Sequence, residues 1–343
     1  MLDLEDCEGV TDKHVSYVCK LYLLRFLSFR GTKISKVPSE ISNLEHLQTF
    51  DVRCTQLGGL PETMTELAKL ERLEFTNRDC YSTMWKLPMG LSKMKALREV
   101  GFAVLENNVQ AAHELGKLEQ LQELTIYLAE EIPNSEAEVL QKFAKSLGKI
   151  YSLRYLNIGD ISWGTNLEFL HSLKEPPRLL RRLRITDNAG GRLPTWFGSL
   201  AYLVEIAIAY VYLVDDEPYG VLCKLPNLKT ITMERDYYTG RQLVARTNHN
   251  FPALINLTLS SFHGSAMPNV LMFEKGSMPK LQKLIVNFFN YDSSIVGIKH
   301  LTSLKEVHLG GQRGNSSLNR ALKKLKAEGR KCSNNFQVVV KYG

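Results

Sequence analysis

The sequence predicts an α/β repeat solenoid, in which short strands stack into one curved parallel sheet. Two observations support this fold class. An apolar pattern, L-x-x-L-x-F, begins at Leu24 and returns at Leu47 and at Leu70, 23 residues apart each time. Proline follows it in segments such as Leu60-Pro61, where a missing N–H suits an irregular return of the chain. A fixed period of this kind is typical of repeats that stack on their neighbours.

The pattern continues along most of the chain. Its twelve anchors are Leu24, Leu47, Leu70, Leu97, Leu121, Leu153, Leu180, Leu203, Leu228, Leu254, Leu281 and Leu304. With one exception, their spacing lies within the leucine-rich repeat range of about 20–29 residues. We therefore predict a leucine-rich repeat horseshoe over residues 1–312, with the parallel sheet on its concave face and an irregular or short-helical convex side.

The chain starts inside the pattern. Leu2 and Leu4 match Leu27 and Phe29, without the residues that would begin the strand. Because an open end of a solenoid needs a cover, we expect protein that precedes this end to cover it.

The one long spacing, from Leu121 to Leu153, predicts an inserted helix near residues 135–148. Apolar residues recur there at helical spacing: Val139, Leu140, Phe143 and Leu147. Ser135 and Glu138 have the spacing of a capping box, and Gly148 can end the helix. A shorter helix is expected from Val109 to Leu115.

Residues 313–343 are predicted to form a C-terminal capping helix and strand. The helix spans Asn319 to Glu328, and the strand begins at Phe336. Seven basic residues and one acidic residue lie between Arg313 and Lys331. We interpret these charges as keeping the open sheet edge in water; a patch for a membrane or a nucleic acid is the alternative.

Composition and motifs favour a cytoplasmic protein without catalytic activity. There is no long apolar run and no signal peptide, and the six cysteines are far apart, which suits reduced thiols. Two glycosylation triplets, at Asn256 and Asn315, point instead to an extracellular protein. The eight histidines form no catalytic or metal-binding motif, and the acidic cluster 215–217 is interpreted as a solvated turn. We expect no cofactor and no metal in this chain.

Residues between the inward leucines should form columns on the concave face, because strand side chains alternate. The fifth-position column is Ser28, Asp51, Glu74, Gly101, Thr125, Asn157, Arg184, Ala207, Thr232, Thr258, Ile285 and His308. The seventh-position column is Arg30, Arg53, Thr76, Ala103, Tyr127, Gly159, Thr186, Ala209, Glu234, Ser260, Asn287 and Gly310. Such varied side chains on a uniform scaffold favour selective protein binding.

Two patches are candidate partner-binding sites. The basic patch is Arg154, Arg181, Arg182 and Arg184, and the aromatic patch is Tyr210, Tyr212, Tyr237, Tyr238, Phe262 and Phe289. The arginines could bind an acidic partner or pair with neighbouring strands, since Arg182 aligns with Glu205 as Arg72 does with Glu99 and Lys283 does with Glu306. The aromatic side chains could anchor an interface or pack beneath loops.

The sequence pattern of the repeats resembles that of a known family. Leu24-x-x-Leu27-x-Phe29-x-x-Thr32-x-Ile34-x-x-Val37-Pro38-x-x-Ile41 is similar to the repeat region of plant intracellular disease-resistance receptors. These are the nucleotide-binding leucine-rich repeat (NLR) proteins, particularly the coiled-coil type of cereals. Since no G-x-x-x-x-G-K-[ST] phosphate loop occurs in this sequence, the resemblance covers only their repeat region.

The resemblance implies a sensor that binds a pathogen effector or a guarded host protein through its C-terminal repeats. It also implies that the N-terminal repeats contact the nucleotide-binding (NB-ARC) module of the same receptor, with an autoinhibitory contact around Arg30, Arg53 and Glu74. ADP or ATP would be bound by that module and not by this chain. Two alternatives stay open: a scaffold or substrate adaptor, for example of a ubiquitin ligase, and the ectodomain of a receptor kinase.

Overall fold

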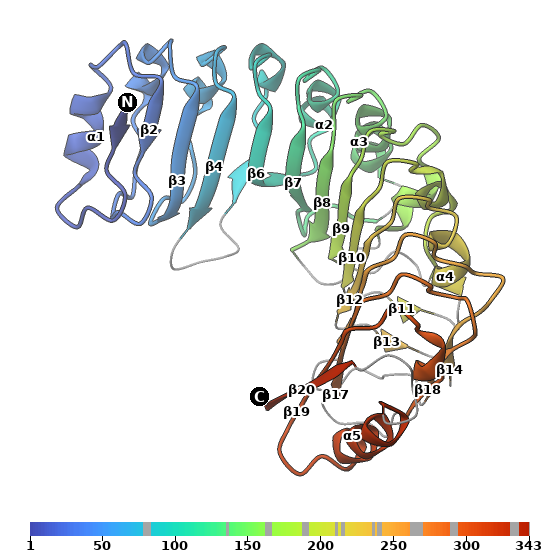
Figure 1. Ribbon diagram of the computed structural model, residues 1–343. Helices are drawn as coiled ribbons and strands as arrows, with labels where there is room; N and C mark the ends of the chain where they lie inside the picture. Colours follow the sequence, from blue (N-terminus) through green and yellow to red (C-terminus); the bar gives the residue numbers. More distant parts are fainter. Residues whose placement is uncertain are drawn as a thin grey trace. The chain divides into compact units, whose positions relative to one another are not determined.

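The computed structural model describes residues 1–77, 84–134, 137–161, 167–186, 192–209, 212–213, 217–234, 237–238, 242–260, 270–288, 294–329 and 336–342. The chain divides into two compact units. The first unit is Met1–Thr165 with Ser172–Leu179, and the second is Asn166–His171 with Leu180–Gly343. In both units each repeat contributes one short strand to a parallel sheet, and a helical or extended segment returns the chain (Figure 1).

The sheet of the first unit follows the chain order. Its strands are β1 (Leu2–Asp3), β2 (Phe26–Ser28), β3 (Thr49–Thr55), β4 (Arg72–Asn77), β6 (Glu99–Leu105), β7 (Glu123–Leu128) and β8 (Tyr155–Asp160). The short strand β5 (Trp85–Lys86) pairs with β6. Leu2 aligns with Leu27, which aligns with Phe50, so strand β1 continues the register of the repeats.

The sheet of the second unit is built in the same way. Its strands are β9 (Arg182–Thr186), β10 (Glu205–Ala209), β12 (Thr230–Glu234), β15 (Asn256–Ser260), β17 (Lys283–Phe288), β19 (Glu306–Gly311) and β20 (Gln337–Tyr342). In the two sheets described above, each of the twelve strands other than β1, β5 and β20 begins two residues after one of the predicted anchors.

The second unit also contains two small parallel sheets that the periodicity did not predict. One pairs β11 (Tyr212–Leu213) with β13 (Tyr237–Tyr238). The other joins β14 (Gln242–Ala245), β16 (Val270–Phe273) and β18 (Ser294–Val296). These strands lie outside the L-x-x-L-x-L pattern, and their pairing requires neighbouring repeats to be aligned first.

The return segments contain short 3-10 helices that begin after proline in three repeats. The 3-10 helices are η1 (Ser39–Asn43), η2 (Glu62–Glu66), η3 (Leu91–Lys93), η4 (Leu167–Ser172), η5 (Thr195–Ser199) and η6 (Ile298–His300). Pro38, Pro61 and Pro194 are the N-cap residues of η1, η2 and η5. Proline fits there because its fixed φ suits the turn and it has no N–H to leave unpaired.

Five α-helices complete the described chain. They are α1 (Asp12–Val18), α2 (Val109–Leu115), α3 (Glu138–Leu147), α4 (Glu217–Leu222) and α5 (Ser316–Gly329). The predicted helices α2 and α3 are present, and α1 was missed. The predicted capping box is wrong, because Ala137 is the N-cap of α3 and Glu138 is therefore its first helical residue; Ser135 lies outside the described residues.

The apolar core lies directly beneath the strands. Leu27, Phe50 and Leu73 are fully buried in the first unit, and Leu257, Leu284 and Val307 are fully buried in the second. Complete burial of one such side chain contributes about 1.5–3 kcal/mol. Because each inward residue is covered by residues of the adjacent repeats, this stabilisation depends on stacking.

A substitution at Gly297 can test how closely the repeats of the second unit pack against each other. Its φ is +85°, and a Cβ atom there would lie 2.1 Å from the Phe273 carbonyl oxygen. We expect Gly297→Ala to lower the free energy of unfolding by about 3 kcal/mol or more, through backbone strain and the collision.

Gly276→Ala is the matched control. Gly276 has a φ of +82°, but a Cβ atom added to it would have no other atom within 4 Å. Only strain of about 1–2 kcal/mol is therefore expected. Urea unfolding measures both values, and equal losses would contradict the predicted collision.

Candidate protein-binding surface

The strand register brings the predicted fifth-position residues together within each unit. In the first unit Ser28 aligns with Asp51, Asp51 with Glu74, and Glu74 with Gly101. In the second unit the aligned residues are Arg184, Ala207, Thr232, Thr258, Ile285 and His308. Each unit therefore presents a row of varied side chains on the outward side of its strands.

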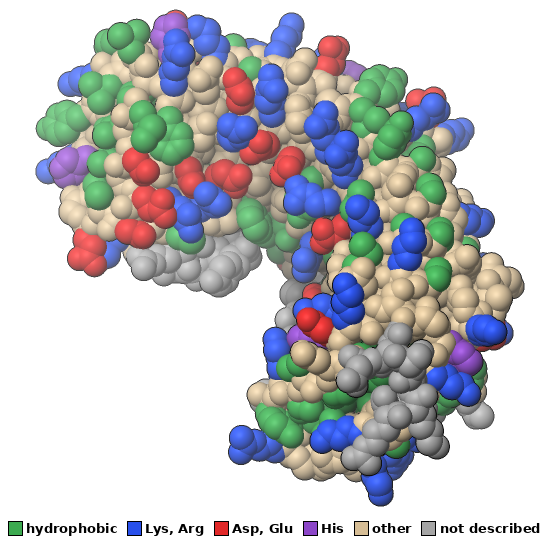
Figure 2. All heavy atoms as spheres, viewed as in Figure 1, with side chains coloured by type: hydrophobic (Ala, Val, Ile, Leu, Met, Phe, Trp, Pro, Cys, Tyr) green, Lys and Arg blue, Asp and Glu red, His purple; other side chains and the backbone are tan. Residues whose placement is uncertain are grey.

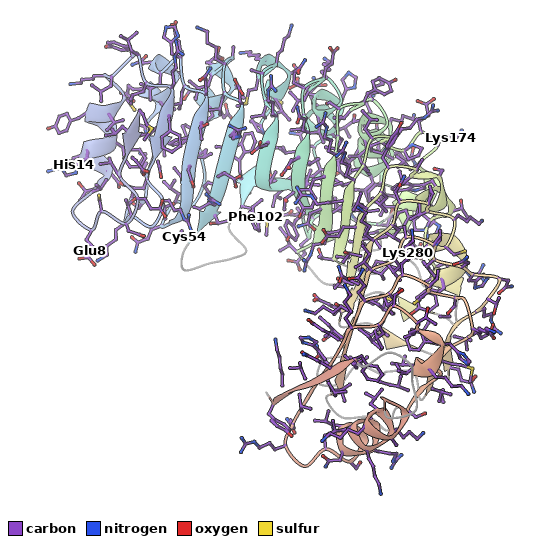
Figure 3. The ribbon with its side chains drawn as sticks, in the orientation of Figure 1. Glu8, His14, Cys54, Phe102, Lys174 and Lys280 are labelled. Carbon is purple, nitrogen blue, oxygen red and sulfur yellow. The ribbon has the colours of Figure 1, made fainter. Side chains whose placement is uncertain are left out.

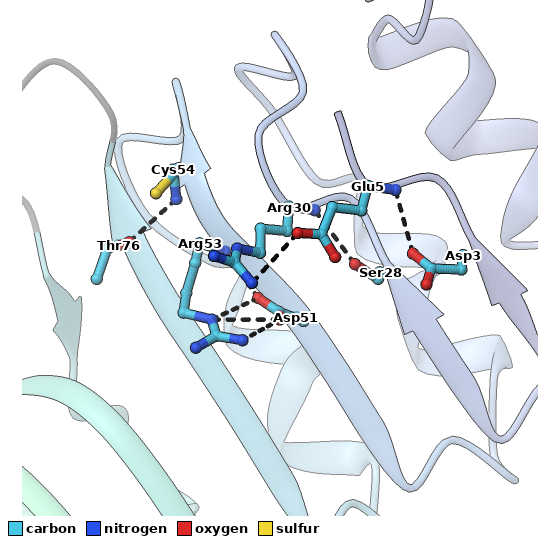
Figure 4. A network of polar contacts seen from close by, with 8 residues as sticks. All are labelled: Asp3, Glu5, Ser28, Arg30, Asp51, Arg53, Cys54 and Thr76. Carbon is cyan, nitrogen blue, oxygen red and sulfur yellow. Dashed lines mark hydrogen bonds and ion pairs between the residues drawn. The ribbon is translucent and has the colours of Figure 1, made fainter. Parts of the chain in front are cut away.

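The predicted autoinhibitory residues Arg30 and Arg53 are engaged in ion pairs on this strand face. Arg30 Nη1 lies 3.2 Å from Glu5 Oε1, and Arg53 Nη2 lies 2.6 Å from Asp51 Oδ2 (Figure 4). Arg53 Nε also donates to Asp51 Oδ1 at 3.0 Å. This hydrogen bonding to Asp51 raises the pKa of the Arg53 guanidinium, so Arg53 is held firmly in its charged form.

Glu74 lies on the same face, in a different electrostatic environment. A Cβ atom at Gly101 would lie 2.5 Å from Glu74 Oε2, which shows that the carboxylate rests on this glycine. Burial raises the pKa of Glu74, as do the charges of Asp51, Glu99 and Glu123, while Arg53 lowers it. The Glu74 charge is therefore only partly compensated.

Two β-bulges change the predicted columns of the first unit. The register shifts in β3 between Val52 and Thr55, and in β6 between Val100 and Ala103. Cys54 and Phe102, both labelled in Figure 3, lie at these two places. Their φ values are +55° and +56°. Ala103 consequently aligns with the inward Ile126 and is fully buried. Its predicted place in the outward column is wrong, because the bulge adds one residue to the strand.

The same bulge turns Phe102 outward, although the repeat pattern assigns it to the core. Phe102 is 36% exposed, and its ring stacks on Tyr127 with centroids 6.4 Å apart and planes 10° apart. An exposed aromatic pair is a common interface anchor. No signal in the sequence identifies it, because the alternation of side chains alone would bury Phe102.

Asn157 adds an unsatisfied acceptor to the strand face of the first unit. It follows the inward Leu156, aligns with Thr125 and is only 7% exposed. Its Oδ1 atom has no hydrogen-bond partner. A buried polar atom without a partner costs free energy unless a donor reaches it.

The basic patch is exposed in both units. Arg181, Arg182 and Arg184 belong to the second unit and Arg154 to the first, and all four are exposed. Arg182 aligns with Glu205, as predicted. Arg184 Nη2 lies 3.8 Å from Glu234 Oε2, two strands away, because the intervening strand β10 carries the small residues Ala207 and Ala209. Neighbour pairing therefore accounts for part of the patch.

The other two predicted cross-strand pairs are also present. Arg72 Nε lies 2.9 Å from Glu99 Oε1, and Lys283 Nζ lies 3.2 Å from Glu306 Oε2. His308 Nε2 lies 2.8 Å from the same Glu306 oxygen. Hydrogen bonds from His308 and Lys283 lower the pKa of Glu306. Exposed pairs of this kind contribute little to stability, because water and salt screen their charges.

The aromatic patch is only partly within the described chain. Tyr212 aligns with Tyr237, and Tyr238 follows in the same strand β13. Tyr210, Phe262 and Phe289 lie outside the described residues, as does most of the acidic cluster at 215–217. The role of this patch stays a prediction.

The described residues contain no group of three or more His, Cys, Asp or Glu side chains that could hold a metal ion. In the same part of the chain, no helix is long and apolar enough to cross a membrane. Cys7, Cys19, Cys54 and Cys223 are free thiols. The asparagines of the two glycosylation triplets make hydrogen bonds: Asn256 Nδ2 donates to Thr230 Oγ1 at 3.3 Å, and Asn315 Oδ1 accepts from the Leu318 N–H at 3.0 Å.

Comparisons with known proteins agree with this architecture. The profile of the leucine-rich repeat region family matches residues 1–336. Disease resistance protein Pik-2 of rice (Oryza sativa subsp. japonica) is 28% identical over 94% of this chain and 36% of that protein. Disease resistance protein RGA5 of the same subspecies is 26% identical over 84% of this chain and 26% of that protein.

A solved leucine-rich repeat protein of Leptospira interrogans has the same fold. The match covers 94% of this chain and 79% of that protein, with a TM-score of 0.55 and 18% identity. The predicted fold class and the resemblance to plant disease-resistance proteins are thereby confirmed. The chain spans about a third of the length of the rice protein Pik-2.

Replacing Glu74 by Gln and replacing Glu306 by Gln should change the stability of the protein in opposite directions. Because the pKa of Glu74 is raised by burial, its ionised form destabilises the fold above that raised pKa. This penalty vanishes below the ordinary glutamate pKa of about 4.3. We expect Glu74→Gln to stabilise the protein at pH 7 and to have no such effect in acid.

Glu306→Gln is the control of opposite sign. The lowered pKa of Glu306 means that its charge stabilises the fold above the ordinary glutamate pKa and that this contribution is lost as pH falls through the lowered pKa. Thermal unfolding of both variants between pH 3 and pH 7 measures the two effects. A Glu74→Gln variant less stable than wild type at pH 7 would contradict the assigned environment.

Proposed function

This chain belongs to the leucine-rich repeat region family, and from that premise we propose that it is the sensor and regulatory module of a plant immune receptor. In this function it binds a pathogen effector or a guarded host protein and catalyses no reaction. The receptor acts in the cytoplasm, and its nucleotide, ADP or ATP, is held by an NB-ARC module outside this chain. The similarity to the rice disease resistance proteins over 94% of the chain is the observation that carries the proposal.

The second unit supplies the recognition surface in this proposal. Its strand face offers Arg181, Arg182 and Arg184 at one end, followed by a row of small side chains along the fifth position. Exposed arginines can form bidentate bonds with carboxylates, so they suit an acidic partner surface. The aromatic patch predicted from the sequence is a second candidate contact for this partner.

The first unit supplies the regulatory contact. Arg30, Arg53 and Glu74 lie on or beside neighbouring strands, and the two arginines are held in place by Glu5 and Asp51. A rigid charged surface of this kind can hold the NB-ARC module in its inactive arrangement, and a partner bound elsewhere can shift that equilibrium.

The gene region upstream of Met1 tests the assignment to this receptor class. We expect the transcript to encode a G-x-x-x-x-G-K-[ST] phosphate loop before the repeats. A signal peptide there would favour the receptor-kinase ectodomain instead, and a helical adaptor would favour the ubiquitin-ligase scaffold. Either result would contradict the proposal.

Replacement of Arg181, Arg182 and Arg184 by Glu tests the recognition surface. In the full-length receptor expressed in leaf tissue, we expect the triple variant to weaken partner binding about tenfold or more, because the surface charge is reversed. A changed level of cell death in the absence of a pathogen is the second expected effect. Co-precipitation and a cell-death assay measure the two outcomes.

Replacement of Lys323, Lys324 and Lys326 by Glu is the matched control. These lysines are exposed on α5, so the change in net charge is the same and lies off the strand face. The control variant should behave like wild type. Equal effects of both triple variants, or none from the arginine variant, would exclude this patch as the recognition surface.

A further inference from the structure

The strand face of the first unit carries a second surface that the proposed recognition site does not use. We call it the acidic–aromatic face, and it consists of Glu74, Glu99, Glu123, Phe102, Tyr127 and Asn157. These residues belong to the adjacent strands β4, β6, β7 and β8. Figure 2 shows acidic side chains gathered over the strands of this unit.

Negative charge is in excess on this face. The carboxylates on and beside this face outnumber the arginines by one: Asp51, Glu71, Glu74, Glu99 and Glu123 stand against Arg53, Arg72, Arg98 and Arg154. Arg72 pairs with Glu99 at 2.9 Å, and Arg98 pairs with Glu71 at 3.5 Å. Burial raises the pKa of the Glu74 carboxyl, Arg53 lowers it, and the charges of Asp51, Glu99 and Glu123 raise it further. A cation from outside would therefore be attracted to the face.

The aromatic pair stands beside this charge. Phe102 follows Gly101, the residue on which the Glu74 carboxylate rests, and Tyr127 lies in the strand that contains Glu123. Phe102 is held outward at a φ of +56°, a left-handed backbone conformation that is strained for a residue with a side chain. The fold therefore bears strain to expose this ring, as is common at binding sites.

Asn157 supplies an independent observation on the same face. Its Oδ1 atom is an acceptor, it is more than nine-tenths buried, and it has no partner. Leu156 and Ile158 point into the core, so strand alternation directs Asn157 to the face that carries Glu123 and Tyr127. Only a hydrogen-bond donor can satisfy this atom.

The features described on this face all favour the same chemistry. Carboxylates and an amide oxygen accept hydrogen bonds, and stacked aromatic rings attract a planar cation. The geometry points to an arginine-bearing segment of a protein partner, whose guanidinium groups would pair with Glu74, stack on Phe102 and donate to Asn157. Lysine fits less well because its ammonium group is not planar.

This surface adds an arginine-binding contact to the proposed function and shares only Glu74 with the regulatory contact. Its test uses purified protein and short peptides, without a receptor or a signalling readout. A negative result would therefore remove the acidic–aromatic face and leave the triple-arginine experiment unaffected.

Fluorescence anisotropy with labelled nona-arginine and nona-lysine peptides measures the proposed contact at low salt. We expect the full chain to bind nona-arginine about threefold or more tightly than nona-lysine, because only guanidinium stacks on the ring pair. Phe102→Ala should remove this preference. Equal affinity for the two peptides in the wild-type protein would overturn the proposal.

The double variant Glu74→Gln, Glu123→Gln should weaken nona-arginine binding about tenfold, since two negative charges are removed from the face. The control Glu45→Gln, Glu119→Gln makes the same charge change at exposed turn positions before β3 and β7, and it should change affinity by less than about twofold. Circular dichroism verifies that each variant is folded. A control that weakens binding as much as the double variant would show attraction to net charge alone and overturn the proposal.

The variant Asn157→Leu tests the contribution of the hydrogen-bond acceptor separately from that of the carboxylates. Replacing an unpartnered buried amide by an apolar side chain should preserve or increase the melting temperature. Binding of nona-arginine should nevertheless weaken about threefold, because one hydrogen bond to the guanidinium is lost. Unchanged affinity in this stable variant would exclude Asn157 and with it the surface as proposed.

Discussion

The structure depends on the burial of one inward side chain by the repeats on either side of it. Leu27, Phe50 and Leu73 are fully buried although each belongs to a strand of only a few residues. No single repeat could bury them, so folding free energy comes from stacking, and stacking requires the strands to keep one register. This constraint fixes the outward residues as firmly as the inward ones.

A fixed register turns the outward positions into an interaction surface. Asp51 aligns with Glu74, and Arg184 aligns with Ala207, so the charges of a partner would meet side chains whose separations are set by the strand spacing. Much of this surface is already paired internally, as with Arg72 and Glu99. The groups most available for binding are those whose charge or hydrogen bonding is incompletely compensated.

Three incompletely compensated features lie on the strand face of the first unit. The partly buried Glu74 has a raised pKa, Asn157 has an orphan acceptor, and Phe102 is exposed in a strained conformation. Each of these features lowers the stability of the fold. Such costs are expected where a surface is shaped for a partner and not for the fold alone.

Periodicity was enough to place the twelve strands, helices α2 and α3, and aligned pairs such as Arg182 with Glu205. The sequence pattern predicts these elements because inward leucines recur wherever a strand must stack on its neighbours. The bulge at Phe102, the burial of Ala103 and the reach of Arg184 to Glu234 became visible only in three dimensions. These depend on what the neighbouring strand presents at the same level: a bulge adds one residue and inverts the alternation, and small residues let a long side chain cross a strand.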